Sequence, residues 1–312
     1  MMASGWEAIA IVGPTATGKT ALALAVAREL GGEVVSVDSR QAYRGMEVGT
    51  AAPARGERRE VVHYGVGFLD PRRRYSAGAF SRFARRWIAD IRERGGVPIL
   101  AGGTGFFLRA LLDPVFREPR LEPERRRALR RWLKDQPPAR VLSWAYRLDP
   151  GLRGRLVRLD GQRAARALEL ALLSGHPLTW WQEHGEPEAR PLHIRCYCLS
   201  LPAGVHRERI RARADALLQG GWLEEVERLR TEASADAPVW SAVGYRDVLA
   251  LADGRLTRDE ALERIVRATW AYARRQRTWF RHQMPEHTVT LDARLPTRQL
   301  ARRLASDWRE GR

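Results

Sequence analysis

One short stretch limits the folds open to this chain more than any other feature. Residues Gly13 to Thr20 read GPTATGKT, which fits the pattern G-x-x-x-x-G-K-[ST]. The apolar run 8–12 before it predicts a buried strand, and the strong helix formers at 21–30 after it predict a helix. A strand, a tight loop and a helix in this order are the setting that a phosphate-binding P-loop requires. This part of the chain is therefore predicted to form the first strand–loop–helix unit of an α/β fold.

The predicted loop offers an anion several contacts. Its backbone N–H groups and the positive end of the following helix attract phosphate oxygens, Lys19 can neutralise their charge, and Thr20 can ligate Mg²⁺. P-loops commonly bind nucleotides such as ATP, but the motif leaves the ligand open, because any diphosphate fits this arrangement. The residues expected to bind phosphate are Gly13, Thr15, Ala16, Thr17, Gly18, Lys19 and Thr20.

Two further apolar runs predict strands of the same sheet. Residues 33–37 and 97–101 are short and apolar, and a helix between them is indicated by apolar residues at helical spacing. Because strands that alternate with helices form parallel sheets, these runs predict a parallel sheet. The residues that indicate the helix are Phe80, Phe83, Trp87, Ile88 and Ile91.

The character of the sequence changes between residues 116 and 190. Strand signals disappear there, and prolines separate arginine-rich helical stretches such as 122–134 and 161–173. Beyond this region the sequence predicts a strand at 192–201 and helices at 205–230, 246–252 and 258–280. We therefore predict an α/β fold, a P-loop NTPase-like parallel sheet flanked by helices, with a helical insertion. The catalytic core is expected at residues 1–115 and 191–312, and the insertion at 116–190.

Polar residues follow two of the predicted strands at their carboxyl ends. Asp38 comes directly after the second strand, so it is expected at the same edge of the sheet as the P-loop. A carboxylate there can accept a proton or hold a metal, but Asp is also a common turn or cap residue, and position alone leaves both open. After the third strand, residues 102–105 read GGTG and offer backbone donors and the Thr104 hydroxyl at a helix start. Turn-forming glycines are the alternative interpretation of that stretch.

The charge of the chain suggests a polyanionic partner. Lys and Arg number 54 against 37 Asp and Glu, which gives a formal charge of +17. Lys19 and Lys134 are the only lysines, and a GC-rich genome would explain the choice of arginine but not the excess of positive charge. Acidic membranes and small anions are alternative partners for a basic protein.

Cysteine usage and hydropathy indicate the compartment. The two cysteines, Cys196 and Cys198, alternate along a predicted strand and fit neither a disulfide framework nor a zinc site. Residues 1–6 lack the features of a signal peptide, and no apolar run is long enough to span a membrane. We therefore expect a monomeric cytoplasmic protein without membrane contact.

Together these motifs resemble the tRNA dimethylallyltransferases, also called tRNA isopentenyltransferases, along nearly the whole chain. The sequence differs from this family at Ala52, where lysine is usual, and at Phe106-Phe107, where Leu-Tyr is usual. The Ala52 difference is expected to weaken one electrostatic contact. We expect no zinc-finger tail of the kind found in longer eukaryotic relatives. The matching stretches are 13–20, 38–41, 43–46, 49–51, 102–105, Asp160 to Arg163, 166–169, 244–246 and 274–281.

The resemblance implies a reaction and its catalytic residues. The donor would be dimethylallyl diphosphate, and the acceptor the exocyclic amine of the adenosine just 3′ of the anticodon in tRNA. An amine conjugated into a purine ring is a poor nucleophile, so a base must take its proton, and Asp38 is the candidate. Lys19, the loop amides and Thr20 with Mg²⁺ would stabilise the leaving diphosphate. From the resemblance alone, Arg213 would bind that diphosphate and Thr104 would hydrogen-bond the leaving oxygen.

The resemblance also implies a tRNA-binding surface. A base in a folded anticodon loop must be unstacked before an enzyme can reach it. Arg274, Arg277 and Arg281 lie at i, i+3 and i+7, and such a basic stripe is either a solvated helix face or a contact to RNA phosphates; we favour the second. The residues expected to contact tRNA are Asp38, Ser39, Arg40, Gln41, Gln162, Arg163, Arg166, Gly244, Tyr245, Arg246, Arg274, Gln276, Arg277 and Arg281.

Two other functions compete with this one. A P-loop kinase for a small molecule or nucleotide would share the loop, Mg²⁺ and the sheet, but would use ATP as donor and close arginines over its γ-phosphate. A non-catalytic RNA-binding protein that uses the loop as a nucleotide switch would explain the charge. It would not need Asp38 and Thr104 beside the phosphates.

Overall fold

The structure is a computed structural model that describes residues 5–154 and 161–311. The chain divides into two compact units. The first unit contains Met1–Asp113 and Pro191–Arg312, and the second, which we call the helical unit, contains Pro114–Arg190. Within the described residues, no helix combines the length and the apolar character needed to cross a bilayer.

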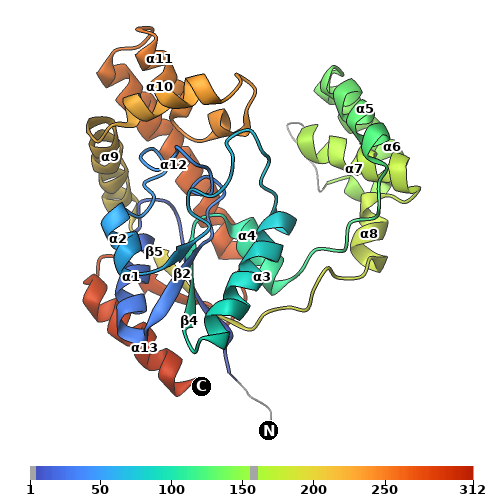
Figure 1. Cartoon of the computed structure of the whole chain (residues 1–312). Coiled ribbons are helices and arrows are strands. Elements are labelled where there is room, and N and C mark those ends of the chain that lie inside the picture. The colour runs from blue at the N-terminus through green and yellow to red at the C-terminus, as the bar shows by residue number, and fades with distance from the viewer. Residues whose placement is uncertain (1–4, 155–160, 312) are drawn as a thin grey trace. The chain divides into compact units, whose positions relative to one another are not determined.

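The first unit is built on a parallel sheet (Figure 1). Among the described residues it has six strands, in the order β3-β2-β4-β1-β5-β6. Strand β1 lies inside the sheet, where Ile9 is opposite Ile99 of β4 and Arg195 of β5. The predicted parallel α/β fold is therefore confirmed. The strands are β1 (Ala8–Val12), β2 (Gly32–Ser36), β3 (His63–Tyr64), β4 (Val97–Gly102), β5 (Ile194–Ser200) and β6 (Val289–Asp292).

Alternate side chains of β1 enter two different hydrophobic cores, as expected for a strand covered on both faces. Ile9 and Ile11 pack with α1 (Lys19–Leu30) and α13 (Thr297–Glu310), two helices that contact each other. Ala8, Ala10 and Val12 face the other core. That core contains residues of α3 (Ala77–Glu93) and α4 (Gly105–Leu112), with Phe280 of α12 (Arg258–Gln283).

A third core gathers the helices that follow β5. It includes Trp222, Tyr245 and Ile265, together with Tyr43 and Met46 from the segment after β2. This packing brings the segment after β2 into contact with helices that come much later in the sequence. The helices are α9 (Ala203–Gln219), α10 (Trp222–Glu232), α11 (Tyr245–Ala252) and α12, with a short 3₁₀ helix at Pro238–Ser241.

The structure differs from the sequence prediction in this C-terminal region. The helix predicted at 205–230 is two helices, because the chain turns at Gly220 and Gly221, and Gly221 has a φ of 94° that favours glycine. Strand β6 and helix α13 were not predicted. In β6 only Leu291 is buried, so the strand lacks an apolar pattern. Helix α13 does carry a signal, since Leu300, Leu304 and Trp308 recur at helical spacing.

The helical unit has a small core of its own. Leu133, Val141, Ala145, Ala164 and Leu168 are buried together. Helices α5 and α7 correspond to the arginine-rich stretches at 122–134 and 161–173. Helices α6 and α8 were not specifically predicted from the sequence. Its helices are α5 (Pro123–Lys134), α6 (Pro138–Leu148), a 3₁₀ helix (Pro150–Leu152), α7 (Gly161–Ser174) and α8 (Leu178–His184).

Candidate active site

The loop between β1 and α1 depends on glycine at two positions. Gly13 has a φ of 140°, and a Cβ there would lie 2.7 Å from the carbonyl oxygen of Leu199 on β5. Gly18 precedes the first residue of α1 with a φ of 91°, so the chain enters the helix in the left-handed region. The loop therefore passes close to the neighbouring strand and turns directly into the helix, as its motif predicts.

Three side chains from distant helices hold Thr15, a residue of this loop. The backbone N–H of Thr15 donates to Oε1 of Gln276 on α12 at 2.8 Å. His206 Nε2, on α9, bonds the Thr15 carbonyl oxygen at 2.8 Å and must donate, because a carbonyl oxygen can only accept. Arg213 Nη1, also on α9, donates to the Thr15 hydroxyl at 3.1 Å. Every polar group of Thr15 is thus fixed by the C-terminal part of the chain.

The loop also makes contacts within itself. Lys19 Nζ donates to the carbonyl oxygen of Pro14 at 2.6 Å, and the Thr17 hydroxyl donates to the same oxygen at 2.8 Å. Thr17 is buried, whereas Ala16, Lys19 and Thr20 are half-buried. The Lys19 ammonium therefore lies at the loop, beside the backbone groups that would receive a phosphate.

Asp38 forms a turn directly after β2. Its Oδ1 accepts hydrogen bonds from the backbone N–H of Arg40 at 2.8 Å and of Gln41 at 3.3 Å. Nearby, the Thr104 hydroxyl accepts from the backbone N–H of Ser39 at 3.1 Å, and the Thr104 N–H donates to the carbonyl oxygen of Val37 at 3.1 Å. The segments after β2 and β4 are therefore joined at the carboxyl edge of the sheet. Asp38 can be a turn residue and still act as a proton acceptor or metal ligand. The turn holds Oδ1, whereas Oδ2 has no hydrogen bond within the described part of the chain.

The glycines after β4 allow α12 to approach this edge. A Cβ on Gly103 would lie 2.4 Å from Gln276 Nε2, and one on Gly105 would lie 2.1 Å from the ring of Trp279. Gln276 Nε2 donates to the Gly103 carbonyl oxygen at 2.8 Å. Because its Oε1 binds Thr15, one buried amide connects the P-loop with the segment that contains Thr104.

A buried carboxylate holds the segment that supports Arg213. Glu225 of α10 accepts from the N–H groups of Val48 at 2.6 Å and Gly49 at 2.9 Å, and from the Tyr245 hydroxyl at 2.7 Å. Next in this segment, the carbonyl oxygen of Thr50 accepts from Arg213 Nη2 at 3.2 Å. The Arg213 guanidinium is therefore fixed between the P-loop and the segment that Glu225 holds.

Charges of both signs meet at this edge. Burial, helped by the Arg213 charge, lowers the pKa of Lys19 to about 7, although Asp38 acts in the opposite direction. Burial also lowers the pKa of Arg213, again opposed by Asp38. Burial and then the Asp38 charge raise the pKa of Tyr272, on α12, to about 12. Two cations, one carboxylate and a neutral phenol therefore lie within electrostatic reach of each other beside the P-loop.

Several residues predicted to contact RNA have internal roles. Gln276 is 7% exposed, and both ends of its amide bind the protein backbone. Tyr245 is fully buried against Glu225, and a Cβ on the preceding Gly244 would lie 2.4 Å from the Trp222 ring. The Gln41 side chain accepts from the Ser36 hydroxyl and donates to backbone oxygens of the segment after Gly49. Gly244, Tyr245 and Gln276 are therefore buried supports of the site, whereas Gln41 is half-buried, and RNA contact by these residues stays a prediction.

Other predicted RNA-contacting residues do reach the surface. Arg246, Arg274 and Arg281 are exposed, and Arg277 is half-buried with its guanidinium 5.7 Å from the centre of the Trp270 ring. Arg207 lies over the same ring at 4.7 Å, so the basic surface includes an arginine that the sequence did not point to. Ser39 and Arg40 are half-buried, and Arg40 Nη1 donates to the carbonyl oxygen of Pro238 at 3.0 Å.

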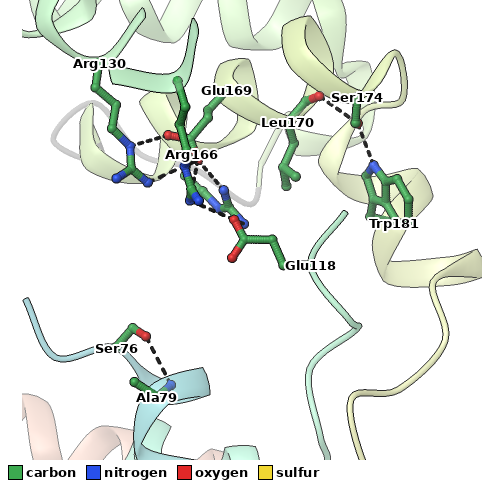
Figure 2. A network of polar contacts seen from close by, with 10 residues as sticks. Ser76, Ala79, Glu118, Arg130, Arg166, Glu169, Leu170, Ser174 and Trp181 are labelled. Carbon is green, nitrogen blue, oxygen red and sulfur yellow. Dashed lines mark hydrogen bonds and ion pairs between the residues drawn. The ribbon is translucent and has the colours of Figure 1, made fainter. Parts of the chain in front are cut away.

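The predicted RNA-contacting residues of the helical unit lie in the first half of α7, and Figure 2 shows one of them, Arg166. Gln162 and Arg163 are exposed. Arg166 pairs with the buried Glu169 and, at 3.0 Å, with Glu118. Arg126 and Arg130 pair with the same Glu169 carboxylate, so Arg166 belongs to an internal ion network. Asp160, part of the matching motif, lies outside the described residues.

The sequence analysis missed three residues that the structure places at the site. Tyr272 lies just before the family motif at 274–281 and precedes Gln276 by one helical turn, so its helical spacing from that motif was a signal that could have found it. His206 and Glu225 act through contacts between distant segments, and nothing in the local sequence indicates such partners.

The fold and the site define a protein with a P-loop-like fold, in which a carboxylate and a hydroxyl lie beside the loop between β1 and α1 at the edge of a parallel sheet. The profile of the IPP transferase family matches residues 41–283. The chain belongs to the IPP transferase family.

Curated relatives agree with this membership. The chain is 40% identical over 287 residues to a tRNA dimethylallyltransferase of Stenotrophomonas maltophilia (strain R551-3), and the match covers 89% of this chain and 90% of the relative. It is 39% identical over 288 residues to a tRNA dimethylallyltransferase of Roseiflexus sp. (strain RS-1), with coverage of 91% and 93%.

Solved structures share the fold. The full-length tRNA isopentenylpyrophosphate transferase of Bacillus halodurans superposes with a TM-score of 0.69 at 29% identity, covering 97% of both chains. A eukaryotic dimethylallyltransferase described as acting on tRNA gives a TM-score of 0.78 at 24% identity and covers 92% of this chain and 73% of its own. At that lower identity the likeness concerns the fold alone.

Proposed function

We propose that this chain transfers a dimethylallyl group from dimethylallyl diphosphate to the exocyclic amine of the adenosine 3′ of the anticodon in tRNA. The observation that carries the proposal is the placement of the P-loop, Asp38 and Thr104 at one edge of the sheet in a member of the IPP transferase family. The relatives named above are transferases of this kind. Nothing in the described part of the chain or in these relatives favours the kinase alternative.

The P-loop binds the diphosphate of the donor in this proposal. The loop N–H groups and the start of α1 face the phosphate oxygens, and Lys19 and Arg213 supply positive charge. Because Arg213 is already fixed by Thr15 and Thr50, it loses little conformational freedom when the diphosphate binds. The same groups then stabilise the charge that develops on the leaving diphosphate.

Thr104 donates a hydrogen bond to the leaving oxygen. Its Oγ1 accepts from the Ser39 N–H at 3.1 Å, so the hydroxyl hydrogen remains to be donated. The competing acceptor, the Ser39 hydroxyl, lies at 3.5 Å, which is a weak contact. As the C–O bond of the donor breaks, its electron pair remains on the diphosphate oxygen that Thr104 contacts.

Asp38 takes the proton of the attacking amine. The amine nitrogen forms the new N–C bond, and its proton moves to the Asp38 carboxylate. The two backbone hydrogen bonds to Oδ1 orient this carboxylate and leave Oδ2 for the amine. The adenine must leave its stack to reach Asp38, as is general for enzymes that act on a base.

We propose Mg²⁺ as the cofactor. Among the described residues, no cluster of three or more His, Cys, Asp or Glu side chains suits a metal. Mg²⁺ is commonly held by few protein groups together with phosphate oxygens and water, so the half-buried Thr20 at the second position of α1 fits as its protein ligand. When bound there, Mg²⁺ would neutralise charge on the diphosphate.

The RNA approaches through the basic surface of α12 in this proposal. Arg274, Arg277 and Arg281 contact phosphates of the anticodon stem-loop, with Arg207 beside Arg277 on Trp270. Gln162 and Arg163 of the helical unit also contact the RNA. We propose that the chain works as a cytoplasmic monomer.

The direct test is transfer of label to unmodified tRNA. The protein is incubated with unmodified tRNA and labelled dimethylallyl diphosphate and, in parallel, with labelled ATP, and both the label bound to tRNA and the label transferred from each donor to any other acceptor are measured. The proposal predicts transfer from dimethylallyl diphosphate and none from ATP. Transfer of label from ATP, without transfer from the prenyl donor, would favour the kinase and overturn the proposal.

A further inference from the structure

Besides the basic surface of α12, a second basic site lies beside β3. This strand forms one edge of the sheet, and β6 forms the opposite edge. Helix α2 (Arg55–Glu60) leads into β3, the edge strand beside β2. An open hollow of about 380 Å³ is formed there by Arg55, Arg58, Arg59, Val62 and His63. These five residues, which we call the α2 hollow, belong to the first unit.

The arginines of the α2 hollow are only partly neutralised by their neighbours. Of the two acidic residues of α2, Glu60 pairs with Arg28 at 2.6 Å. Glu57 accepts from the Ala54 N–H at 2.7 Å and keeps its negative charge, so it balances one of the positive charges nearby. Within the part of the chain that the structure describes, Arg55, Arg58 and Arg59 form no ion pair and no side-chain hydrogen bond. A net positive charge therefore remains around the hollow.

Two polar atoms of the hollow are buried without a partner among the described residues: Arg58 Nε and His63 Nε2. The other ring nitrogen of His63 bonds the Val61 carbonyl oxygen at 2.7 Å and must donate to it. Buried polar groups are normally hydrogen-bonded, so an unpaired guanidinium N–H at a cationic hollow indicates a missing acceptor.

The α2 hollow is separate from the P-loop. In the sheet, β2 and β4 lie between β3 and β1, the strand that carries the P-loop. The Glu60 partner, Arg28, is in the last turn of α1, whereas the P-loop meets the first turn of that helix. An anion in the hollow would therefore not touch the groups assigned to the donor diphosphate.

We propose that the α2 hollow binds a phosphate group. Guanidinium groups bind phosphate in a bidentate manner, and several arginines around one hollow suit an anion with several charged oxygens. The phosphate belongs either to an RNA backbone, for which a chain of charge +17 is suited, or to a free small phosphate. The binding chemistry is the same in both cases, and it does not depend on prenyl transfer.

The first arm of the test uses labelled inorganic pyrophosphate as the probe. Binding stoichiometry is measured by equilibrium dialysis for the wild type and for the triple variant Arg55→Gln/Arg58→Gln/Arg59→Gln. Glutamine keeps the length and helix preference of the side chain and removes the charge. Arg302→Gln, at an exposed position of α13, is the matched control. If free phosphate is the ligand, the triple variant binds one equivalent fewer than the wild type and the control.

The second arm measures tRNA affinity across a salt series for the same proteins. If the occupant is an RNA phosphate, losing one contact flattens the log-log salt slope by about 0.7 to 0.9. The Arg302→Gln control keeps the wild-type slope. Prenyl transfer is assayed separately, so a protein without that activity can still give either positive result.

Circular dichroism and thermal unfolding establish that the triple variant is folded. If it is not, the single variants Arg55→Gln, Arg58→Gln and Arg59→Gln replace it. A lower pyrophosphate stoichiometry or a flatter tRNA slope supports the proposal and identifies the source of the phosphate. Stoichiometry and slope equal to those of Arg302→Gln in both arms would overturn it.

Discussion

Gln276 accepts a hydrogen bond from the backbone N–H of Thr15 at 2.8 Å, although the two residues are 261 positions apart in the sequence. The other end of the same amide donates to Gly103. Helix α12 therefore fixes both the loop between β1 and α1, proposed to bind phosphate, and the segment that carries Thr104. A helix predicted to bind RNA thus also determines the geometry of the donor site.

Replacing Gln276 by leucine should damage the donor site and the stability of the fold together. Leucine leaves the Thr15 N–H and the Gly103 carbonyl oxygen buried without partners, and such a loss costs about 1–3 kcal/mol per group. We expect a lower free energy of unfolding in urea and a raised KM for dimethylallyl diphosphate. Gln299→Leu, at an exposed position of α13, is the control and should change neither quantity. An unchanged KM for dimethylallyl diphosphate in Gln276→Leu would show that Gln276 does not position the donor site.

Diphosphate binding should weaken as the pH rises above neutrality. The pKa of Lys19 in the free protein is about 7, and the bound diphosphate raises it, so binding takes up a proton. Below pH 7 the ammonium is already present, whereas above it affinity should fall by up to about tenfold per pH unit. The measurement is pyrophosphate affinity from pH 6 to about 9 without added metal. Pyrophosphate itself loses protons in this range, so the wild type is compared with Lys19→Ala at each pH. The ratio of their affinities should fall as the pH rises above 7, and a constant ratio would contradict the assignment.

Asp38→Asn should reduce turnover and leave tRNA binding largely intact. The Asn side-chain oxygen can still accept from the Arg40 N–H, so the turn is kept while the base is removed. We expect kcat to fall by roughly 10²- to 10⁴-fold. Single-turnover transfer and tRNA affinity, measured on the same protein, distinguish the two effects. Normal turnover with weakened tRNA binding would make Asp38 a positioning residue.

The arginines on α12 should determine how tRNA binding depends on salt. Replacing Arg274, Arg277 or Arg281 by glutamine should flatten the log-log salt slope by about 0.7 for each lost phosphate contact, with weaker binding to all tRNA sequences. Affinity for dimethylallyl diphosphate is the control, and it should hardly change. If all three variants keep wild-type slopes, this stripe is a solvated face and the RNA contacts lie elsewhere, for example at the exposed Arg163.

Much of the fold could be predicted from local patterns. The P-loop motif and the apolar runs identified β1, α1, β2 and β4, because buried parallel strands are short, continuous and apolar. Strands β3 and β6 could not be found in this way. Each is an edge strand of a few residues, and tertiary pairing rather than sequence pattern stabilises it.

The site was predictable only where its residues follow a strand or belong to a motif. Asp38 and Thr104 follow closely after β2 and β4, and Lys19 belongs to the motif after β1; the carboxyl ends of these strands meet at one edge. The roles of Gln276 and Tyr245 could not be derived, because a motif position gives no burial and both side chains bond segments far away in the sequence. A position in a family motif alone could not show whether such a residue contacts RNA or holds other parts of the protein in place.

The most direct test of the central claim is the position of the prenyl group in the product. Unmodified tRNA is reacted with labelled dimethylallyl diphosphate, digested to nucleosides and analysed by mass spectrometry. A second tRNA, in which the adenosine 3′ of the anticodon is replaced by guanosine, is treated in the same way. The account predicts that all label lies on the exocyclic amine of that adenosine and that the guanosine variant receives none. Label on another nucleotide, or equal labelling of both tRNAs, would contradict it.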